Sequence, residues 1–491
     1  MSASSQKTET SSGNDYLVAV PNWVRVVDGI ALALVVAILA GGFASEGYIA
    51  NLEARGWAFA GCALLGIWGV VGWTMGRWSG APRAASRWIA YAGLAAVIWT
   101  GVQTIPLSRE RVTAISPVWQ QVEADFAEAG VPMPERIPIA HSPVRSRLSW
   151  NHLVALLGFY LGVATLATRR GSTIVLLVVL CALTVAEGAF GAYTFLVKGV
   201  PRAYGAAWNP SHHAALTLMG IPVLVAALLE LRRQIPRYSD AILSGRNPLI
   251  LLFFLVGVAL LGWGAGLSRA SIMFGLLVLT GWGVLELWAA LKSSGERTGL
   301  RGLWRLAGGG LVVIVLLCGA VLLLVLAAVP EGVAHRGFSA DPAMLTRRVD
   351  FWRASVEALR ETPWLGLGPA GTEHALTRFV HVPTFKNPVH SHNDYVQSVA
   401  ELGIPAAAVV LVLLLVGAVL LLRDWRNQRR VFDWEERLLR RACGAGVLTI
   451  LLHTLVDFPL RIPLVGFVFL ILLALVVNPG PLLVAGYARR R

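Results

Sequence analysis

Charged residues are scarce in this chain of 491 residues, where Asp, Glu, Lys and Arg make up 14% of the total. Soluble domains contain roughly 25%. Hydrophobic residues reach 56%, more than the interior of an ordinary soluble fold can hide from water. The shortage of charge therefore excludes a typical soluble enzyme.

Cysteine is also scarce, and the spacing of the four cysteines fits no metal site. All of them lie within apolar runs, so a disulfide framework is not expected. They are Cys62, Cys181, Cys318 and Cys443. The first 15 residues are polar and the first apolar run is long, so we expect no cleavable signal peptide.

Several motifs of soluble catalysis are missing. The chain has no HExxH, Walker or GxSxG motif and no cluster of carboxylates of metal-site type. A G-x-G-x-x-G pattern occurs at 366–371, but it follows an amphipathic helix rather than a strand, so we predict a tight turn. We therefore expect neither a bound metal nor a cofactor.

Long apolar runs without period-2 alternation are abundant instead, and they predict membrane-spanning helices rather than a barrel. The predicted fold is an all-α polytopic membrane protein with about twelve spans. Their centres lie near Val36, Leu65, Ala95, Gly158, Cys181, Val223, Val256, Val278, Leu317, Leu411, Thr449 and Leu470.

An even number of spans puts both tails on one side of the membrane. That side carries the larger share of the 42 Lys and Arg residues, so we expect it to be cytoplasmic. The net charge of +14 then reflects topology and not a nucleic-acid partner. The predicted regions are tail 1–27, helices 28–198, a second membrane region 199–477 and basic tail 478–491.

Two long loops are predicted on the opposite, periplasmic side. The loop at 108–149 has a helix start at Ser116–Pro117, and we expect one helix there that lies on the membrane surface. The loop at 331–395 precedes the tenth span. It has a helix start at Asp341–Pro342 and a stop at Pro363.

The strongest group of chemical residues is His390-Ser391-His392-Asn393-Asp394, where the second loop meets the tenth span. Ser391 and Asp394 have capping-box spacing, which predicts that a helix starts here. The two histidines are candidates for general-base work or ligation. The alternative is that both are ordinary polar residues of the membrane interface.

Arginines beside apolar spans form a second group. Arg269 lies in a turn between two spans, where a charge is costly and often functional. Arg347 and Arg348 lie on the loop helix, and a guanidinium can grip two phosphate oxygens. Arg353 and Glu357 are predicted to form an ordinary i,i+4 surface pair.

Two further segments carry polar residues near span ends. One contains Asn209 and His212, at the start of the sixth span. In the other, His453 and Asp457 are one helical turn apart, so Asp457 can orient His453. Equally, these two can be a packing pair that satisfies itself.

Taken together, these stretches resemble the O-antigen ligase superfamily, which also contains O-antigen and exopolysaccharide polymerases. His392-Asn393, followed after nine residues by Gly403, is similar to the ligase motif, although Ala406 stands where Gly, Thr or Tyr is usual. The resemblance extends over 199–470 and includes Arg348-x3-Trp352, the Arg269 turn and 453–463. Ser211 stands where the family often has Asn.

This resemblance implies a GT-C-like fold and a metal-independent, inverting glycosyltransferase of the inner membrane. The donor would be a glycan on undecaprenyl diphosphate at the periplasmic face. The acceptor would be lipid A-core for a ligase, or a polysaccharide for a polymerase. His392, Arg269 and Arg348 would be catalytic. Substrate-binding residues would be His390, Asn393, Asn209, His212, Arg347, His453 and Asp457.

A transporter or flippase is the alternative from another class. Glu187, Glu230 and Glu286 lie in spans or at their ends, as substrate or proton sites do in transporters. However, no broken helices pair between two halves of the chain, and the polar residues concentrate on the periplasmic side.

Overall fold

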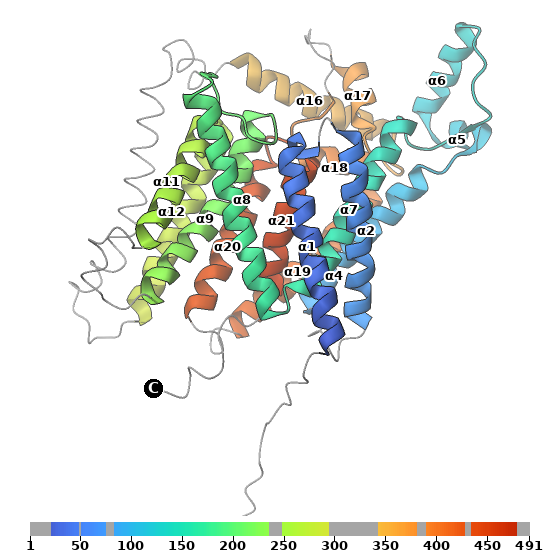
Figure 1. Cartoon of the computed structure of the whole chain (residues 1–491). Coiled ribbons are helices and arrows are strands. Elements are labelled where there is room, and N and C mark those ends of the chain that lie inside the picture. Colours follow the sequence, from blue (N-terminus) through green and yellow to red (C-terminus); the bar gives the residue numbers. More distant parts are fainter. Residues whose placement is uncertain are drawn as a thin grey trace, which may run out of the picture.

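The computed structural model describes residues 21–48, 51–74, 83–234, 248–293, 342–380, 389–427 and 434–478. Long helices stand side by side and form a bundle (Figure 1). They are α1 (Asn22–Ala44), α2 (Leu52–Thr74), α4 (Ala84–Gln103), α7 (Pro143–Leu166), α8 (Arg170–Leu196), α9 (Pro210–Gln234), α11 (Pro248–Ala265), α12 (Arg269–Ser293), α19 (Ile404–Asn427), α20 (Trp434–His453) and α21 (Pro463–Val477).

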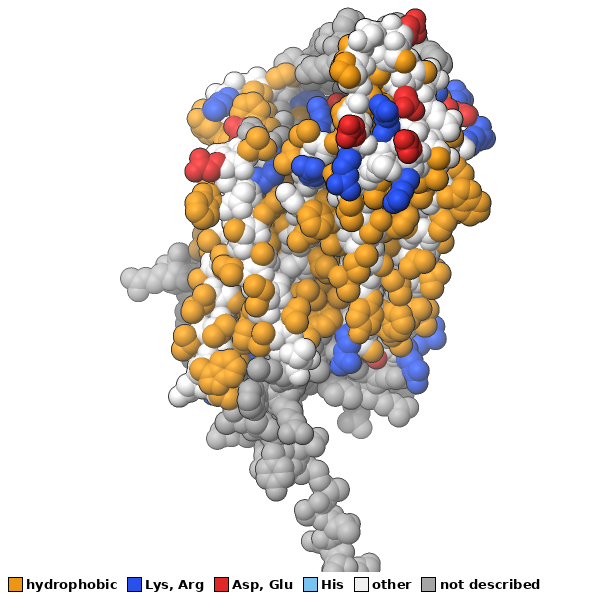
Figure 2. All heavy atoms as spheres, turned by 90° about the vertical axis from the view of Figure 1, so that its right-hand side faces the viewer, with side chains coloured by type: hydrophobic (Ala, Val, Ile, Leu, Met, Phe, Trp, Pro, Cys, Tyr) orange, Lys and Arg blue, Asp and Glu red, His pale blue; other side chains and the backbone are white. Residues whose placement is uncertain are grey.

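The bundle has the surface of a membrane protein. Seven of the described helices are long and apolar enough to cross a membrane. In the apolar window of α19 only 6% of residues are buried, which only a lipid environment tolerates. Figure 2 shows a broad hydrophobic band between two charged ends on one face. The prediction of a helical, multi-pass membrane protein is confirmed.

Eleven of the twelve predicted span centres fall inside these helices, and Leu317 lies outside the described residues. Two of the helices, α11 and α21, have shorter apolar segments, Ile250–Ala265 and Pro463–Val477. The count of twelve spans therefore stays a prediction.

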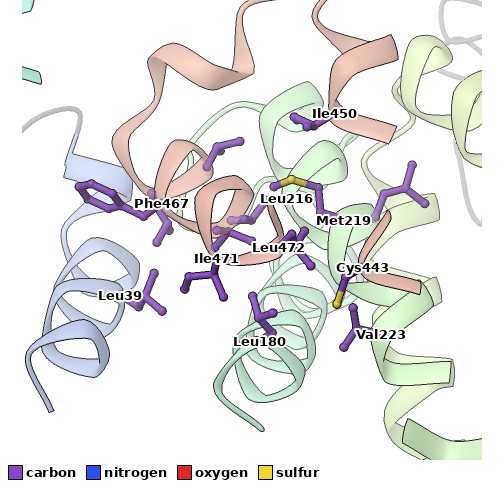
Figure 3. Packing of buried hydrophobic residues seen from close by; sticks show 14 of the residues in the cluster. Leu39, Leu180, Leu216, Met219, Val223, Cys443, Ile450, Phe467, Ile471 and Leu472 are labelled. Carbon is purple, nitrogen blue, oxygen red and sulfur yellow. The ribbon is translucent and has the colours of Figure 1, made fainter. Parts of the chain in front are cut away.

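Helix α9 is the most enclosed of the seven, with 89% of its apolar window buried. Met219 of α9, Cys443 of α20 and Leu472 of α21 pack together at the centre of the bundle (Figure 3). Helices α8 and α11 approach closely at Gly188 and Gly262, where a Cβ on either glycine would meet the other helix's backbone.

Both long loops lie at the same end of the bundle, the upper end in Figure 1. The first holds α5 (Arg109–Ile115), α6 (Pro117–Glu128) and a two-stranded antiparallel sheet of β1 (Leu107–Ser108) and β2 (Arg136–Ile137). Ser116 caps α6, as predicted. The loop holds two helices and not the one that was expected, and Trp119 of α6 is buried against Val112, Met133 and Ile137. The placement of α6 on the membrane surface stays a prediction.

The second loop holds α16 (Pro342–Glu361), α17 (Thr372–Phe379) and α18 (Asp394–Leu402). Helix α16 starts at Pro342 and ends just before Pro363, as predicted. A helix also starts at Asp394, but its cap is Asn393 and not Ser391. The predicted Arg353–Glu357 pair is wrong too: Arg353 pairs with Asp350 at 3.4 Å, and Glu357 with Arg360 at 2.7 Å.

The glycine pattern at 366–371 forms a turn, as predicted. Gly366 and Gly368 have φ of 71° and 77°, which favour glycine. The turn packs against the end of α18, where Gly366 faces Gly403 and the N–H of Leu367 donates to Ala400 O at 2.9 Å. This contact joins α16 and α17 to the start of α19.

The opposite end of the bundle carries the start of α1 and the end of α21. Asp28 of α1 pairs there with Arg169, just before α8. At the C-terminal end of α1, by contrast, the short helix η1 (Glu46–Tyr48) lies beside Ile462, which follows η5 (Pro459–Arg461). The described ends, residues 21 and 478, therefore lie on the side away from both long loops (Figure 1).

Candidate active site

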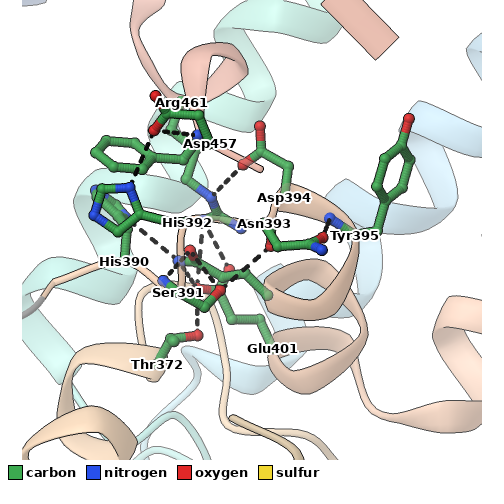
Figure 4. Close-up of polar contacts among 12 residues, drawn as sticks. Thr372, His390, Ser391, His392, Asn393, Asp394, Tyr395, Glu401, Asp457 and Arg461 are labelled. Carbon is green, nitrogen blue, oxygen red and sulfur yellow. Dashed lines mark hydrogen bonds and ion pairs between the residues drawn. The ribbon is translucent and has the colours of Figure 1, made fainter. Parts of the chain in front are cut away.

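Three histidines surround the carboxylate of Asp457 in the turn after α20. His392 Nδ1 lies 3.1 Å from Asp457 Oδ1 (Figure 4). His212 Nε2, from the start of α9, lies 3.8 Å from the same oxygen. His453 Nε2, from the end of α20, lies 3.8 Å from Asp457 Oδ2. These four side chains are called the Asp457 cluster, and the sequence analysis had singled out every one of them.

The electrostatics of this cluster favour an ionised Asp457. Burial acts to raise the pKa of this carboxyl, but the interactions with His212, His392 and His453 outweigh burial and hold the pKa well below its usual range. An ionised carboxylate only accepts, so His392 Nδ1 donates and its Nε2 keeps the lone pair. An imidazole that is oriented by a carboxylate in this way can act as a general base.

The three histidines differ in how far their side chains are exposed to solvent. The side chains of His453 and His212 are 0% and 3% exposed, whereas that of His392 is 34% exposed. Only His392 can therefore meet a ligand from outside. The two buried histidines enclose the carboxylate of Asp457 instead.

Aromatic rings enclose the cluster. Phe458 packs against His390, His212 and His392, with ring centroids 4.2, 4.9 and 4.9 Å away. On the other side, Phe351 of α16 stacks on His392 at 6.0 Å. Arg347 and Arg348 precede Phe351 by four and three residues, so they share its face of α16.

A second set of charges, the Arg461 cluster, lies beside the first (Figure 4). Arg461 pairs with Asp394 at 3.1 Å and with Glu401 at 3.0 Å. Glu401 also accepts from Thr372 at 3.0 Å and from Gln397 at 2.8 Å. These bonds join η5, α17 and α18, so Arg461 fixes the helices around His392.

Burial sets the protonation of two neighbours of Arg461. It raises the pKa of Asp394 to about 6, although Arg461 acts to lower it. Burial, together with the charge of Arg461, lowers the pKa of His390 to about 3. His390 Nδ1 accepts from Gln397 Nε2 at 3.2 Å, which fits a neutral ring. Burial also acts to lower the pKa of Arg461, but Glu401 and Asp394 outweigh it and raise that pKa.

The turn around Arg269 forms the third part of the site. Asn209 Oδ1 accepts the N–H of Ser211 at 2.8 Å and so shapes the start of α9. Arg269 begins α12 and is exposed. Arg202 Nε donates to Gly266 O, in the same turn, at 3.2 Å. Burial lowers the pKa of Arg202, Arg269 lowers it further and Asp457 acts in the opposite direction.

Residues 246–411 match the family model of the O-antigen ligase. This match confirms the predicted O-antigen ligase superfamily for that segment of the chain. No curated protein sequence matches it. The matched ligase segment contains Arg269, Arg348, His392 and Gly403, while Asp457 lies beyond its end. The family makes the chain a membrane glycan transferase of the ligase or polymerase type.

Strained backbone in this ligase-family chain gathers at the same end as the site. The non-glycine residues with positive φ, among those described, lie in the short connections there. They are Glu46, Tyr48, Trp208, Leu267, Ala370 and His392. Such conformations are costly and concentrate at functional sites. His392, with φ of 52°, is both strained and bonded to Asp457.

Two of the three acidic residues behind the transporter alternative, Glu187 and Glu286, have structural partners. Glu187 Oε1 lies 2.8 Å from His213 Nδ1, and its Oε2 accepts the N–H of Ala206 at 3.1 Å. Glu286 bonds Arg441 at 2.5 Å. These bonds favour a structural role for the two residues over a place in a transport path.

Proposed function

We propose that this protein transfers a glycan from undecaprenyl diphosphate to an acceptor hydroxyl at the periplasmic face of the bacterial inner membrane. The observation that carries the proposal is the His392–Asp457 pair, in which a partly exposed imidazole is oriented by a buried carboxylate. With Nδ1 bonded to Asp457, Nε2 is the basic atom of the ring. A hydroxyl at that atom becomes a nucleophile.

The proposed reaction is a single displacement. The acceptor O–H gives its proton to His392 Nε2 while its oxygen attacks the anomeric carbon of the donor. The bond between that carbon and the diphosphate oxygen breaks, and undecaprenyl diphosphate leaves with the electron pair. Attack from the face opposite the leaving group inverts the anomeric configuration. Asp457 stabilises the imidazolium that forms.

Arginines are the proposed partners of the departing diphosphate. Arg269 and Arg348 each carry a permanent charge and can bind two phosphate oxygens, and Arg347 supports Arg348 on the same face of α16. Asn209, Asn393, His212 and His453 shape or orient the site, since their side chains are engaged in caps or buried near Asp457. His390 lies between Phe458 and Gln397 and limits the space beside His392.

Both a ligase and a polymerase could carry out this reaction. A lipid A-core acceptor would make the protein a ligase, and the end of another repeat unit would make it a polymerase. Deletion of the gene separates them on a polysaccharide gel. Loss of the whole ladder from lipid A-core indicates a ligase, and a single-unit product indicates a polymerase.

The test of the base uses His392→Ala, with His374→Ala on α17 as the matched control. Transfer is measured in membrane vesicles with lipid-linked glycan, and the amount of inserted protein is checked by immunoblot. Loss of a general base typically lowers the rate by about 100- to 10,000-fold. Asp457→Asn keeps an acceptor for His392 Nδ1 but removes the charge, so the rate of transfer should fall less than in His392→Ala. Undiminished transfer by His392→Ala would refute the assignment.

The leaving-group arginines give a second test. Within the described residues, no three His, Cys, Asp or Glu side chains are arranged to hold a metal ion. Transfer by purified protein should therefore persist in excess EDTA. Arg269→Ala and Arg348→Ala should each lower the rate about 100- to 1,000-fold, with only partial rescue by lysine. If activity disappears in EDTA and returns with magnesium, a metal ion and not the arginines stabilises the leaving diphosphate.

A further inference from the structure

An exposed tryptophan lies just before α9, four residues from His212, in a conformation that tryptophan rarely adopts. Trp208 is 58% exposed, and its φ is 50°. A bulky residue with positive φ is strained, and the strain persists only where the surroundings impose it. Because more than half of this side chain remains outside the fold, its burial does not explain why the strain is tolerated.

The loop that carries Trp208 is fixed at several points. The N–H of Ala203 donates to Ala265 O at 2.8 Å, and Thr194 Oγ1 donates to Tyr204 O at 3.1 Å. The N–H of Ala206 donates to the buried Glu187 at 3.1 Å. The ring of Tyr204 lies 5.5 Å from that of Trp208, at 38° between their planes. Two aromatic rings are thus held in place before any ligand arrives.

Charges of the site adjoin this aromatic pair. Arg202 precedes Tyr204 by two residues and bonds the carbonyl of Gly266, next to the Arg269 turn. His212 follows Trp208 by four residues and reaches Asp457. The pair therefore stands between the arginine turn and the start of α9.

We propose that Trp208 and Tyr204 form a binding platform for a sugar ring of the donor glycan. This inference rests on the proposed function. A pyranose ring has C–H faces that pack on aromatic rings, while its hydroxyl edges stay in water. A Trp–Tyr pair offers a large apolar surface with polar edges, at little entropic cost when it is already fixed. The adjoining arginine turn leaves the diphosphate end of the same donor close to positive charge.

The competing role is that of an interface anchor, which tryptophan often plays at membrane surfaces. Trp57 provides the comparison. It is 73% exposed near the start of α2, at the same end of the bundle, and has no ring contact among the described residues. An anchor needs neither a strained backbone nor a paired ring, and Trp208 has both.

The experiment measures lipid binding to the full-length protein in nanodiscs by native mass spectrometry. The probes are the lipid-linked glycan extracted from cells that lack the gene, and undecaprenyl diphosphate without sugar. Trp208→Ala should weaken binding of the glycan lipid about 10-fold and leave binding of undecaprenyl diphosphate unchanged. Trp57→Ala should change neither. Trp208→Gly, which adopts positive φ without strain, should fold well and show the same selective loss.

The outcomes separate the two levels of inference. If the wild-type protein does not bind the glycan lipid, the proposed function fails and the platform with it. If the wild type binds it and Trp208→Ala weakens both probes equally, Trp208 is an interface anchor and only the platform is refuted. Unchanged binding of both probes by Trp208→Ala and Trp208→Gly would refute the platform as well.

Discussion

At the scale of single residues, surroundings distinguish histidines that look alike in sequence. His390 and His392 are two positions apart, but His390 is packed against Phe458 and Gln397, whereas His392 meets Asp457 and remains partly exposed. Asp457 is 65 residues further along the chain. The same short motif thus contains one neutral packing residue and one candidate base.

The opposite pKa shifts of His390 and Asp394 predict opposite effects of pH on stability. The pKa of His390 falls from 6.5 to about 3, so its contribution to stability is present above pH 6.5 and is lost as pH falls. The pKa of Asp394 rises from 3.8 to about 6, so its contribution is present below pH 3.8 and is lost as pH rises. In the native chain the two slopes oppose each other between these values.

Single substitutions should reveal each slope. Asp394→Asn leaves the His390 contribution, so the thermal unfolding midpoint should rise between pH 4.5 and 6. His390→Gln leaves the Asp394 contribution, so the midpoint should fall over the same interval. Scanning fluorimetry in one detergent measures both. Parallel slopes in the two variants would show that these groups do not carry the shifts.

The sequence indicated the Asp457 cluster but not the Arg461 cluster, and the reason is chemical. His392 and Asp457 belong to residue types that suggest catalysis wherever they occur. Arg461 and Glu401 look like ordinary charges near span ends, and Asp394 suggested only a helix start. The bonds of Arg461 to Asp394 and Glu401 cross 67 and 60 residues of sequence. Arg202 was missed for the same reason: only the fold brings it to the Gly266 turn.

At the scale of elements, caps and turns explain where the sequence succeeded and where it failed. Ser391 and Asn393 are both good capping residues, and only the extended backbone of Asn393, with φ of −158° and ψ of 107°, lets its side chain accept from Tyr395 and Val396. Helix starts at Pro117 and Pro342 were predictable because proline restricts its own φ. The packing of α5 against α6 was not predictable, because the small sheet beside them has strands of two residues, too short to show a pattern in the sequence.

The contact between the glycine turn and the end of α18 predicts the effect of Gly403→Ala. Gly403 has φ of 78°, and an added Cβ would lie 2.8 Å from Gly366 N and Trp364 O, both backbone atoms. Strain and overpacking should together lower the free energy of unfolding by about 3 kcal/mol. Transfer should fall too, since this contact supports the loop above His392.

Gly29→Ala in α1 is the matched control. No atom lies within 4 Å of the Cβ that alanine would add there. Alanine favours a helix over glycine, so this variant should gain up to about 1 kcal/mol. Denaturant titration in mixed micelles measures both variants. Equal stability of Gly403→Ala and the wild type would show that the two turns do not pack as described.

At the scale of the whole molecule, the polar groups of the candidate site lie together at one end of the bundle. The Asp457 cluster, the Arg461 cluster and the Arg269 turn come from segments spread over most of the chain, yet all meet at the end that carries both long loops (Figure 1). The length of the apolar runs could predict the spans, because each helix that crosses the hydrocarbon core needs about 20 apolar residues of its own. It could not predict which span ends meet, since that depends on helix packing around α9.

This polarity predicts which sites an impermeant maleimide reaches. Ala129, at the end of α6, is exposed on the face of the long loops. Gly171, at the start of α8, is exposed at the opposite end, next to the Arg169–Asp28 pair, and no atom lies within 4 Å of an added Cβ. In protein whose native cysteines are replaced by alanine, Ala129→Cys should be labelled in intact cells with a permeabilised outer membrane. Gly171→Cys should be labelled only after lysis, because positive charge keeps its side in the cytoplasm. The reverse pattern would place the Asp457 cluster in the cytoplasm, where a glycan exported on undecaprenyl diphosphate could not reach His392.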